Sequence, residues 1–186
     1  GFVNWIHSFK SIAINQGISP RIYDETFRGV TEPDALVLEK ANYQPEFKAE
    51  AWEYMDGRIQ ERAITTGQAM LQQYAKELAS LERSTGVDRY VLLAIWSMES
   101  NYGAVLKDKT KLHYIPRALA TLAYADPKRE KFARTQLIAG LKILQRGDVS
   151  QTEFLGSWAG AMGHTQFIPT SYIAYAVDFD GDGKSD

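Results

Sequence analysis

One carboxylate stands inside an apolar helical run in the stretch AIWSMESNYG, which covers residues 94–103. The pattern predicts a helix over 88–102, with Asp88 as its N-cap and Gly103 just past its end. The apolar residues that would share one face of this helix are Leu92, Ile95, Trp96 and Tyr102. At about 100° per residue, Glu99 falls within roughly 20° of the first of these. We therefore expect Glu99 to lie within the apolar stripe.

A carboxylate in that position favours proton-transfer chemistry. Burying an unpaired carboxylate costs several kcal/mol or raises its pKa until the group holds a proton. Such a group suits the acid of glycoside cleavage, a reaction that usually needs a second carboxylate as nucleophile or base. No second carboxylate is evident, because Asp88 and Asp108 lie in cap or loop contexts. A buried structural carboxylate, bonded to a nearby hydroxyl, remains the alternative interpretation of Glu99.

Other catalytic arrangements find less support. The three histidines His7, His113 and His164 lack metal-ligand spacing, and no Ser-His-Asp set is evident. The small-residue stretch 156–170 could line a cleft or pack helices closely. It has neither the preceding strand nor the lysine of a phosphate-binding loop.

The second local signal is an acidic stretch at residues 178–186, DFDGDGKSD. The calcium-loop ligands that it predicts are Asp178, Asp180, Asp182, the Lys184 carbonyl and Asp186, at positions 1, 3, 5, 7 and 9. Gly183 stands at position 6, where such loops turn sharply. Position 12 would fall after residue 186, so we expect the natural chain to continue. An acidic solvated turn is the alternative interpretation.

The elements around these motifs are predicted to be almost entirely helical. The expected helices cover 2–16, 20–28, 33–41, 46–55, 68–84, 88–102, 116–124 and 128–146. No alternating strand pattern of five or more residues, repeat or linker is found. The fold class is therefore mostly α.

Composition narrows the function classes. The chain has 186 residues, 45% hydrophobic and 24% charged, as expected of one globular domain. A formal net charge of −2 gives no reason to expect nucleic acid as a partner. No apolar run is long enough to span a membrane, and residues 1–16 do not resemble a signal peptide. The absence of Cys excludes disulfides and thiolate chemistry in this chain. Ten Tyr and four Trp suit either a sugar-stacking groove or a core.

Three motifs together resemble the lytic murein transglycosylase B family. They are AIWSMESNYG, the segment EFLGSWAGAMGHTQFIPTSYIAYAVDFDGDG and, between them, RALATLAY at 117–124. The resemblance extends from about residue 43 to the end of the chain. It implies a lysozyme-like α domain with additional helices and an EF-hand-like calcium loop near the end of this chain. A single catalytic domain over 1–186 is expected, with an N-terminal helical part to about 67, a core to about 177, and the loop at 178–186.

The same resemblance implies an activity that explains the lone carboxylate. Family members cleave the β-1,4 bond between N-acetylmuramic acid and N-acetylglucosamine in peptidoglycan and leave a 1,6-anhydromuramoyl end. The sugar's own 6-hydroxyl attacks, with help from the 2-acetamido group, so Glu99 would serve first as acid and then as base. No cofactor is expected for the chemistry, and Ca²⁺ is expected to be structural. A hydrolytic muramidase of the same fold and a non-catalytic, calcium-stabilised wall-binding module remain alternatives.

Further site residues follow only from the resemblance. The substrate-groove positions that it implies are Tyr54, Ser157, Met162, Gln166 and Phe167. Ser157 and Gln166 would hydrogen-bond near the reacting sugar. Lys128 and Arg129 match a basic pair that would meet peptide-stem or muramoyl carboxylates, although a solvent-exposed first helical turn is the alternative. The family often has two arginines there, and the lysine at position 128 cannot make the bidentate contact that an arginine makes with a carboxylate.

The resemblance also sets expectations for partners and location. The partners would be peptidoglycan glycan strands, with no nucleic acid and no membrane-spanning segment, and the protein would act as a monomer. The compartment would be the periplasm of a Gram-negative bacterium. An outer-membrane anchor on the full-length form stays open.

Overall fold

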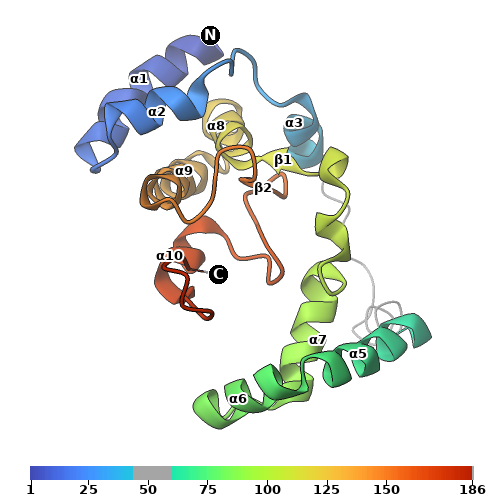
Figure 1. Cartoon of the computed structure of the whole chain (residues 1–186). Helices are drawn as coiled ribbons and strands as arrows, with labels where there is room; N and C mark the ends of the chain where they lie inside the picture. The colour runs from blue at the N-terminus through green and yellow to red at the C-terminus, as the bar shows by residue number, and fades with distance from the viewer. Residues whose placement is uncertain (44–59, 186) are drawn as a thin grey trace. The chain divides into compact units, whose positions relative to one another are not determined.

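The computed structural model describes residues 1–43 and 60–185, and these are mostly helical (Figure 1). The helices are α1 (Phe2–Asn15), α2 (Pro20–Phe27), α3 (Ala35–Asn42), α5 (Glu61–Gln73), α6 (Ala75–Thr85), α7 (Arg89–Ser100), α8 (Ile115–Ala125), α9 (Glu130–Arg146) and α10 (Pro169–Tyr175). Two short strands, β1 (His113–Tyr114) and β2 (Leu155–Gly156), and 3₁₀ turns at Ala104–Leu106 and Lys109–Lys111 complete the described elements. No helix within the described residues is long and apolar enough to cross a bilayer.

The described residues divide into two compact units. The first unit comprises residues 1–43, 109–162 and 167–185, and the second unit comprises residues 60–108 and 163–166. The single catalytic domain expected from the sequence stays a prediction. Each unit is considered by itself below.

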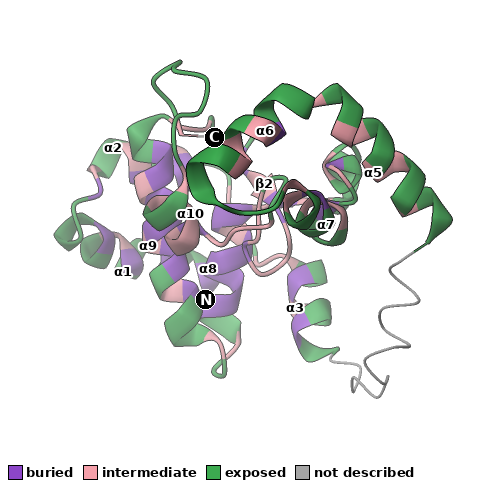
Figure 2. Cartoon of the chain, turned by 90° about the horizontal axis from the view of Figure 1, so that it is seen from below, coloured by how far each residue is buried: buried purple, intermediate pink, exposed green. Residues whose placement is uncertain are grey.

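The first unit is built around α8 and α9, which pack against each other. Ile115, Leu119 and Leu122 on α8 recur at helical spacing and are fully buried, as are Leu137 and Leu141 on α9. Helices α1, α2 and α10 pack against this pair, and Figure 2 shows the resulting concentration of buried residues on α8 and α9. This apolar core is the main source of the unit's stability.

Local signals fix helix ends in the first unit, and α2 begins at residue 20 as predicted, whereas α3 begins two residues later than predicted. Ser19 accepts a hydrogen bond from the Ile22 N–H at 3.2 Å, and Pro20 occupies the first turn of α2. Asp34 caps α3 by accepting from the Leu36 and Val37 N–H groups. The other face of the Asp34 carboxylate meets the buried His113 ring, with 2.8 Å between Oδ2 and Nδ1.

The small antiparallel sheet was not predicted. His113 pairs with Gly156 and Tyr114 pairs with Leu155. Two-residue strands carry too few positions to show an alternating pattern, so no strand signal was visible for them in the sequence. Glycine is required in β2, because a Cβ on Gly156 would lie 2.3 Å from the Ala161 carbonyl oxygen.

The second unit contains α5, α6 and α7, and its helices are mostly exposed (Figure 2). One continuous helix predicted over 68–84 is wrong, because Tyr74 interrupts it with φ −108° and ψ 28°. The Tyr74 ring instead packs edge-on against Trp96, with ring centroids 5.6 Å apart. Apolar periodicity continues through such a break, so the pattern alone could not reveal it.

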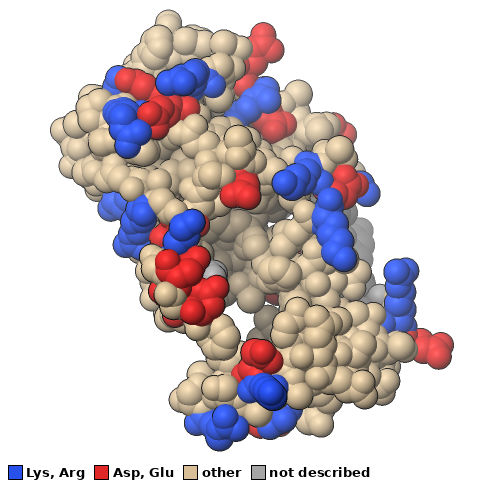
Figure 3. All heavy atoms as spheres, in the orientation of Figure 1, with Lys and Arg blue, Asp and Glu red and all other residues tan. Residues whose placement is uncertain are grey.

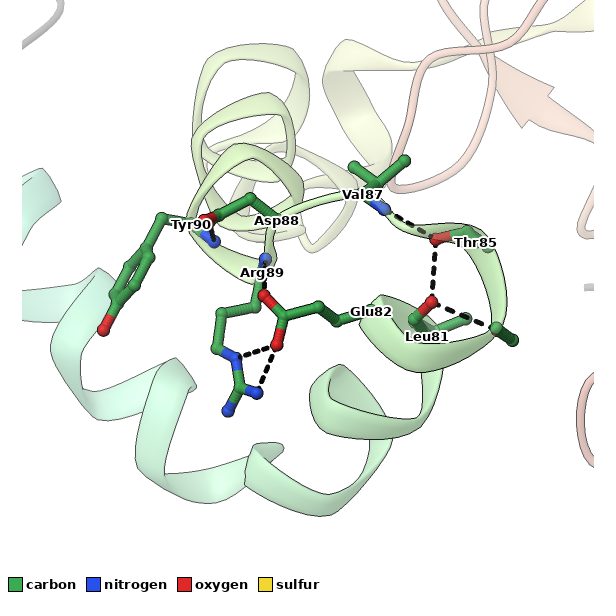
Figure 4. Close-up of polar contacts among 8 residues, drawn as sticks. Leu81, Glu82, Thr85, Val87, Asp88, Arg89 and Tyr90 are labelled. Carbon is green, nitrogen blue, oxygen red and sulfur yellow. Dashed lines mark hydrogen bonds and ion pairs between the residues drawn. The ribbon is translucent and has the colours of Figure 1, made fainter.

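A polar connection joins α6 to α7 within the second unit. The Glu82 carboxylate accepts from the Arg89 backbone N–H at 3.1 Å and from the guanidinium Nε at 2.9 Å, and it also contacts Nη2 (Figure 4). The hydrogen bonds from Arg89 hold the pKa of Glu82 below its usual value. Asp88 caps α7 through the Tyr90 N–H, as predicted.

The remaining helical predictions agree with the structure to within about two residues. The helix expected over 46–55 lies outside the described residues. Lys128 and Arg129 precede α9, which begins at Glu130 rather than at residue 128. Helix α7 ends at Ser100, two residues earlier than expected.

Candidate functional site

Glu99 lies on the last turn of α7, but it is exposed, so the expected burial in an apolar stripe is wrong. The side of α7 that is buried carries Leu93 and Ser100. Ile95, on the predicted stripe, is 46% exposed. The prediction failed because it assumed that an apolar helical face is always covered. In the part of the chain that the structure describes, the Glu99 carboxylate makes no hydrogen bond or ion pair.

The residues on both sides of Glu99 are fixed by the loop 163–166. Ser100 is 1% exposed, and its hydroxyl donates to the His164 carbonyl at 2.7 Å. One turn earlier, the Trp96 indole N–H donates to His164 Nδ1 at 2.8 Å. This bond requires an unprotonated Nδ1, so the ring carries its proton on Nε2. His164 thereby holds the turn that presents Glu99.

The chain reverses directly after Glu99 through three left-handed residues. Asn101, Tyr102 and Gly103 have φ values of 49°, 55° and 81°. The Gly103 N–H donates to the Ser100 hydroxyl at 3.0 Å, which satisfies one bond of the tight turn. A Cβ on Gly103 would lie 2.3 Å from His164 Cε1, so this position has no room for a side chain. The motif Glu-Ser-Asn-Tyr-Gly at residues 99–103 therefore builds one compact turn, the Glu99 turn.

Tyr102 connects the same turn to α5. Its ring meets Trp96 edge-on at 5.4 Å, and its hydroxyl donates to the Ala63 carbonyl at 3.2 Å. A Cβ on Gly67 would lie 2.6 Å from the Tyr102 hydroxyl oxygen, so α5 approaches closely at this point. The Glu99 turn is thus held by contacts from two directions within the second unit.

Ser157, a predicted groove residue, lies in the first unit and organises its own loop. Its hydroxyl oxygen accepts from the Ala161 N–H at 2.9 Å and from the Ala159 N–H at 3.3 Å. Its backbone N–H donates to the Ala161 carbonyl at 2.7 Å. Both side-chain bonds use the oxygen as acceptor, which leaves the hydroxyl hydrogen for a ligand.

Met162 and Phe167 form an isolated antiparallel bridge in the first unit, in which the Met162 N–H donates to the Phe167 carbonyl at 3.0 Å. The structure thus places these two predicted groove residues side by side. Gln166 lies in the intervening loop, with φ at +52°, and belongs to the second unit. Its side-chain amide donates to the Gly163 carbonyl at 2.9 Å and so closes the loop.

The two residues of the predicted basic pair, Lys128 and Arg129, differ in the contacts that they already make. Arg129 bonds to Asp126 at 2.5 Å and lies over the Trp158 ring, 5.5 Å from its centroid. Burial would raise the pKa of Asp126, but hydrogen bonds from Arg129 and from the Lys128 N–H lower it. The Lys128 side chain is exposed. Their role toward ligand carboxylates stays a prediction.

The acidic loop brings three of its predicted calcium ligands close together, and the calcium loop itself stays a prediction. Asp178, Asp180 and Asp182 each offer a carboxylate oxygen, and these atoms lie within 4.8 Å of one another. Asp178 accepts from three backbone N–H groups, those of residues 181, 182 and 183. Figure 3 shows acidic side chains gathered over the end of the chain after α10. Clustered oxygen donors of this kind suit a hard cation such as Ca²⁺.

Several predicted residues stay untested by this geometry. Tyr54 and Asp186 lie outside the described residues, and Lys184 is exposed, with its carbonyl role still a prediction. Conversely, sequence reasoning missed His164, whose two bonds hold the Glu99 turn. No spacing rule could have found it, because it follows Trp96 by 68 residues.

Comparison with known protein families identifies the class of this domain. The sequence matches the transglycosylase SLT domain family over residues 1–186, and the chain belongs to this family. The predicted mostly helical, lysozyme-like fold class is confirmed.

Individual relatives agree with this assignment. The chain is 35% identical over 120 residues to membrane-bound lytic murein transglycosylase B of Escherichia coli K12, covering 64% of this chain and 32% of that protein. It is similar to SltB3 of Pseudomonas aeruginosa in complex with NAG-anhNAM-pentapeptide, with 45% identity and a TM-score of 0.91. That match covers 99% of this chain and 48% of SltB3.

A third relative carries a metal. The Escherichia coli lytic transglycosylase Slt35 in complex with calcium is 26% identical, with a TM-score of 0.82, covering 98% of this chain and 57% of that one. The chain thus spans about a third of the curated relative and about half of SltB3.

Proposed function

We propose that the protein is a peptidoglycan lytic transglycosylase that cleaves the β-1,4 bond between N-acetylmuramic acid and N-acetylglucosamine. The observation that carries the proposal is the Glu99 turn. Its carboxylate is exposed and unpaired among the described residues, whereas the neighbouring Ser100 and Trp96 are both bonded to His164. A group that takes and returns a proton needs this combination of freedom and fixed position.

The proposed reaction uses one carboxyl group twice. Glu99 first donates its proton to the 4-oxygen of the leaving sugar as the glycosidic bond breaks. The ionised Glu99 then accepts the proton of the muramoyl 6-hydroxyl as that oxygen bonds to the anomeric carbon. The products are a free 4-hydroxyl and a 1,6-anhydro ring, and Glu99 regains its proton without water being consumed.

Ser157, Met162 and Phe167 remain proposed contacts of the glycan, as the resemblance implies. The Ser157 hydroxyl hydrogen is available to an acceptor such as the acetamido carbonyl, because both described bonds to this side chain use its oxygen. The adjacent apolar side chains of Met162 and Phe167 would contact the sugar face. The substrate class is supported by the SltB3 complex with NAG-anhNAM-pentapeptide.

Replacing Glu99 tests its catalytic role. Glu99→Gln keeps the size of the side chain and removes the transferable proton, so lysis of purified sacculi should fall about 10²–10⁴-fold. The matched control is Glu77→Gln on α6, an exposed carboxylate that makes no ion pair among the described residues. The control should lyse sacculi like the unmodified protein, and both variants should still sediment with them. Unchanged turnover in Glu99→Gln would sink the assignment.

For the acidic loop we propose a structural Ca²⁺ site held by Asp178, Asp180 and Asp182. The ion would neutralise three carboxylates that repel one another and would supply no step of the reaction. Adding Ca²⁺ should raise the thermal midpoint of unfolding, and Asp180→Asn should reduce that rise. Chelation that lowered activity and left the midpoint unchanged would contradict a structural role.

The proposed substrate also indicates where the protein acts. Peptidoglycan lies in the cell envelope, and the Escherichia coli relative is described as membrane-bound. We infer that the protein works in the periplasm. Fractionation that recovered it outside the envelope would contradict this.

A further inference from the structure

The first unit contains a groove whose lining includes none of the residues proposed to take part in cleavage. Side chains of α1, α9 and α10 line a space of about 560 Å³, within the range of about 300–1,000 Å³ typical of ligand clefts. Apolar groups from all three helices contribute to its lining, namely Phe9, Ile138 and Ile173. The groove therefore offers a ligand both shape and apolar contact.

Cationic side chains follow this groove along one face of α9. Arg134, Lys142 and Arg146 line it at intervals of eight and four residues, which places them on the same side of the helix. No Asp or Glu belongs to its lining as described, although the whole chain has a formal net charge of −2. Positive charge is thus concentrated at this groove, whereas the chain as a whole carries a small negative net charge.

Two of these cations are available to a ligand. Lys142 and Arg146 make no ion pair with any described residue. Arg134 is held more firmly, because its Nε bonds to Glu130 at 2.9 Å and its guanidinium lies 5.5 Å from the ring centroids of Trp5 and Phe9. Arg134 therefore forms a fixed end of the groove.

The span of the cations matches a short peptide. Arg146 follows Arg134 by twelve positions, which is about 18 Å along a helix. An extended peptide of five residues spans about 17 Å. Gln16 and Thr135 also line the groove and carry polar groups that could bond to a peptide backbone.

We propose that this groove binds the peptide stem of peptidoglycan, with Lys142 and Arg146 contacting its carboxylates and the apolar lining contacting its alkyl groups. The inference rests on the proposed function, because it takes peptidoglycan as the polymer that the protein meets. It adds a second contact with that polymer, made by residues that transfer no proton. Such a contact would raise the local concentration of glycan strands through multivalency.

A peptide fits the groove better than a lipid surface does. A peptide stem combines several free carboxylates with alkyl side chains, which corresponds to spaced cations beside apolar side chains. The cations here line a concavity, whereas a polybasic segment that binds anionic lipid must reach a flat surface. Binding to an anionic lipid surface is the competing result that the experiment can return.

The test is a calorimetric titration of the Glu99→Gln protein with a glycan-free pentapeptide stem. The same peptide with its carboxylates amidated is the ligand control. Removing both free cations, in Lys142→Gln/Arg146→Gln, should weaken binding at least tenfold. The matched control, Lys131→Gln, removes a charge from α9 outside the groove lining and should stay within twofold. Affinity should also fall as salt rises, since charges at an open groove are screened.

Three results would overturn the proposal: no binding of the free peptide, equal affinity for the amidated peptide, or unchanged affinity in Lys142→Gln/Arg146→Gln. Sedimentation with phosphatidylglycerol vesicles that depends on both cations, in the absence of peptide binding, would replace it with a lipid site. The catalytic proposal is tested separately by lysis of sacculi. Unchanged lysis in Glu99→Gln would refute that proposal, while peptide affinity alone decides the groove.

Discussion

The two units of the chain are held together by different forces. In the first unit, side chains such as Leu119 and Leu141 are fully buried in an apolar core. Among the described residues of the second unit, only Leu78, Leu93, Ser100 and Gly103 are buried. The second unit relies more on directional contacts, including the bonds from Trp96 and Ser100 to His164.

This contrast bears on the role that we propose for Glu99. A helix that presents this carboxylate to a ligand, as we propose, cannot bury it in its own core. The second unit instead fixes the residues around it, with Ser100 buried and Gly103 packed against the His164 ring. Apolar packing thus stabilises the first unit, while hydrogen bonds set the geometry of the second.

The largest effect should come from the apolar core. Leu119→Ala in the first unit should lower the free energy of unfolding by about 3–5 kcal/mol, because the shortened side chain leaves a cavity among the packed helices. The matched change Leu93→Ala in the second unit should cost about 2–3 kcal/mol, since fewer buried neighbours surround it. Urea denaturation measures both. An equal or larger loss for Leu93→Ala would remove the contrast between the units.

Two glycines of the second unit differ in the space around them. Gly86 and Gly103 both have left-handed backbones, with φ values of 73° and 81°. A Cβ on Gly86 meets nothing within 4 Å, whereas one on Gly103 would strike the His164 ring. Gly86→Ala should cost about 1 kcal/mol of backbone strain. Gly103→Ala should cost at least about 1 kcal/mol more by collision with the ring.

Activity separates the two glycine variants further. Gly103→Ala should lower lysis of sacculi because it displaces the loop from the Glu99 turn, while Gly86→Ala should leave lysis near normal. Thermal melts and turbidity assays on both variants give the comparison. Equal stability and equal activity would show that His164 does not hold this turn.

The smallest effect concerns the ion pairs. Burial by itself raises the pKa of Asp34, but hydrogen bonds from His113 and the Val37 N–H, with the charges of His113 and Arg117, lower it below 3.8. A carboxyl whose pKa is lowered on folding adds stability above its unfolded pKa, and this stability is lost as the pH falls through the folded pKa. Stability from Asp34 should therefore decline below about pH 4.

The second unit provides the comparison for this titration. Asp34→Asn keeps a residue able to cap α3. In this variant the free energy of unfolding should fall less steeply as the pH is lowered. Glu82→Gln should reduce the steepness of that fall less, because the Glu82–Arg89 pair is more exposed and is screened by water. Unfolding free energies measured from pH 2 to 6 distinguish the two. A larger effect of Glu82→Gln would reverse the expected ranking.

The starts of α2 and α7 were predictable because short-range chemistry sets them. Ser19 with Pro20 begins α2 and Asp88 caps α7, through their own side chains or fixed φ. Asp34, which caps α3, was not predicted as a cap. Glu99 was identified as a candidate by its residue type inside an apolar run. Its exposure was not predicted, because periodicity shows which residues share a face and not whether another element covers it.

Long-range contacts account for the other failures. At the break, Tyr74 packs against Trp96, and next to Glu99 the Trp96 indole bonds to His164, a residue far along the chain. The short β1–β2 pairing likewise joins segments that are distant in sequence. Local spacing carries no information on such partners.

The central claim is that Glu99 promotes cleavage without water as a reactant. It is tested most directly by digesting purified sacculi in ¹⁸O-labelled water and analysing the released fragments by mass spectrometry. We expect muropeptides with 1,6-anhydro ends, each lighter by one water than a reducing end and free of ¹⁸O. Fragments with reducing ends that carry ¹⁸O would contradict the claim and identify the protein as a hydrolytic muramidase.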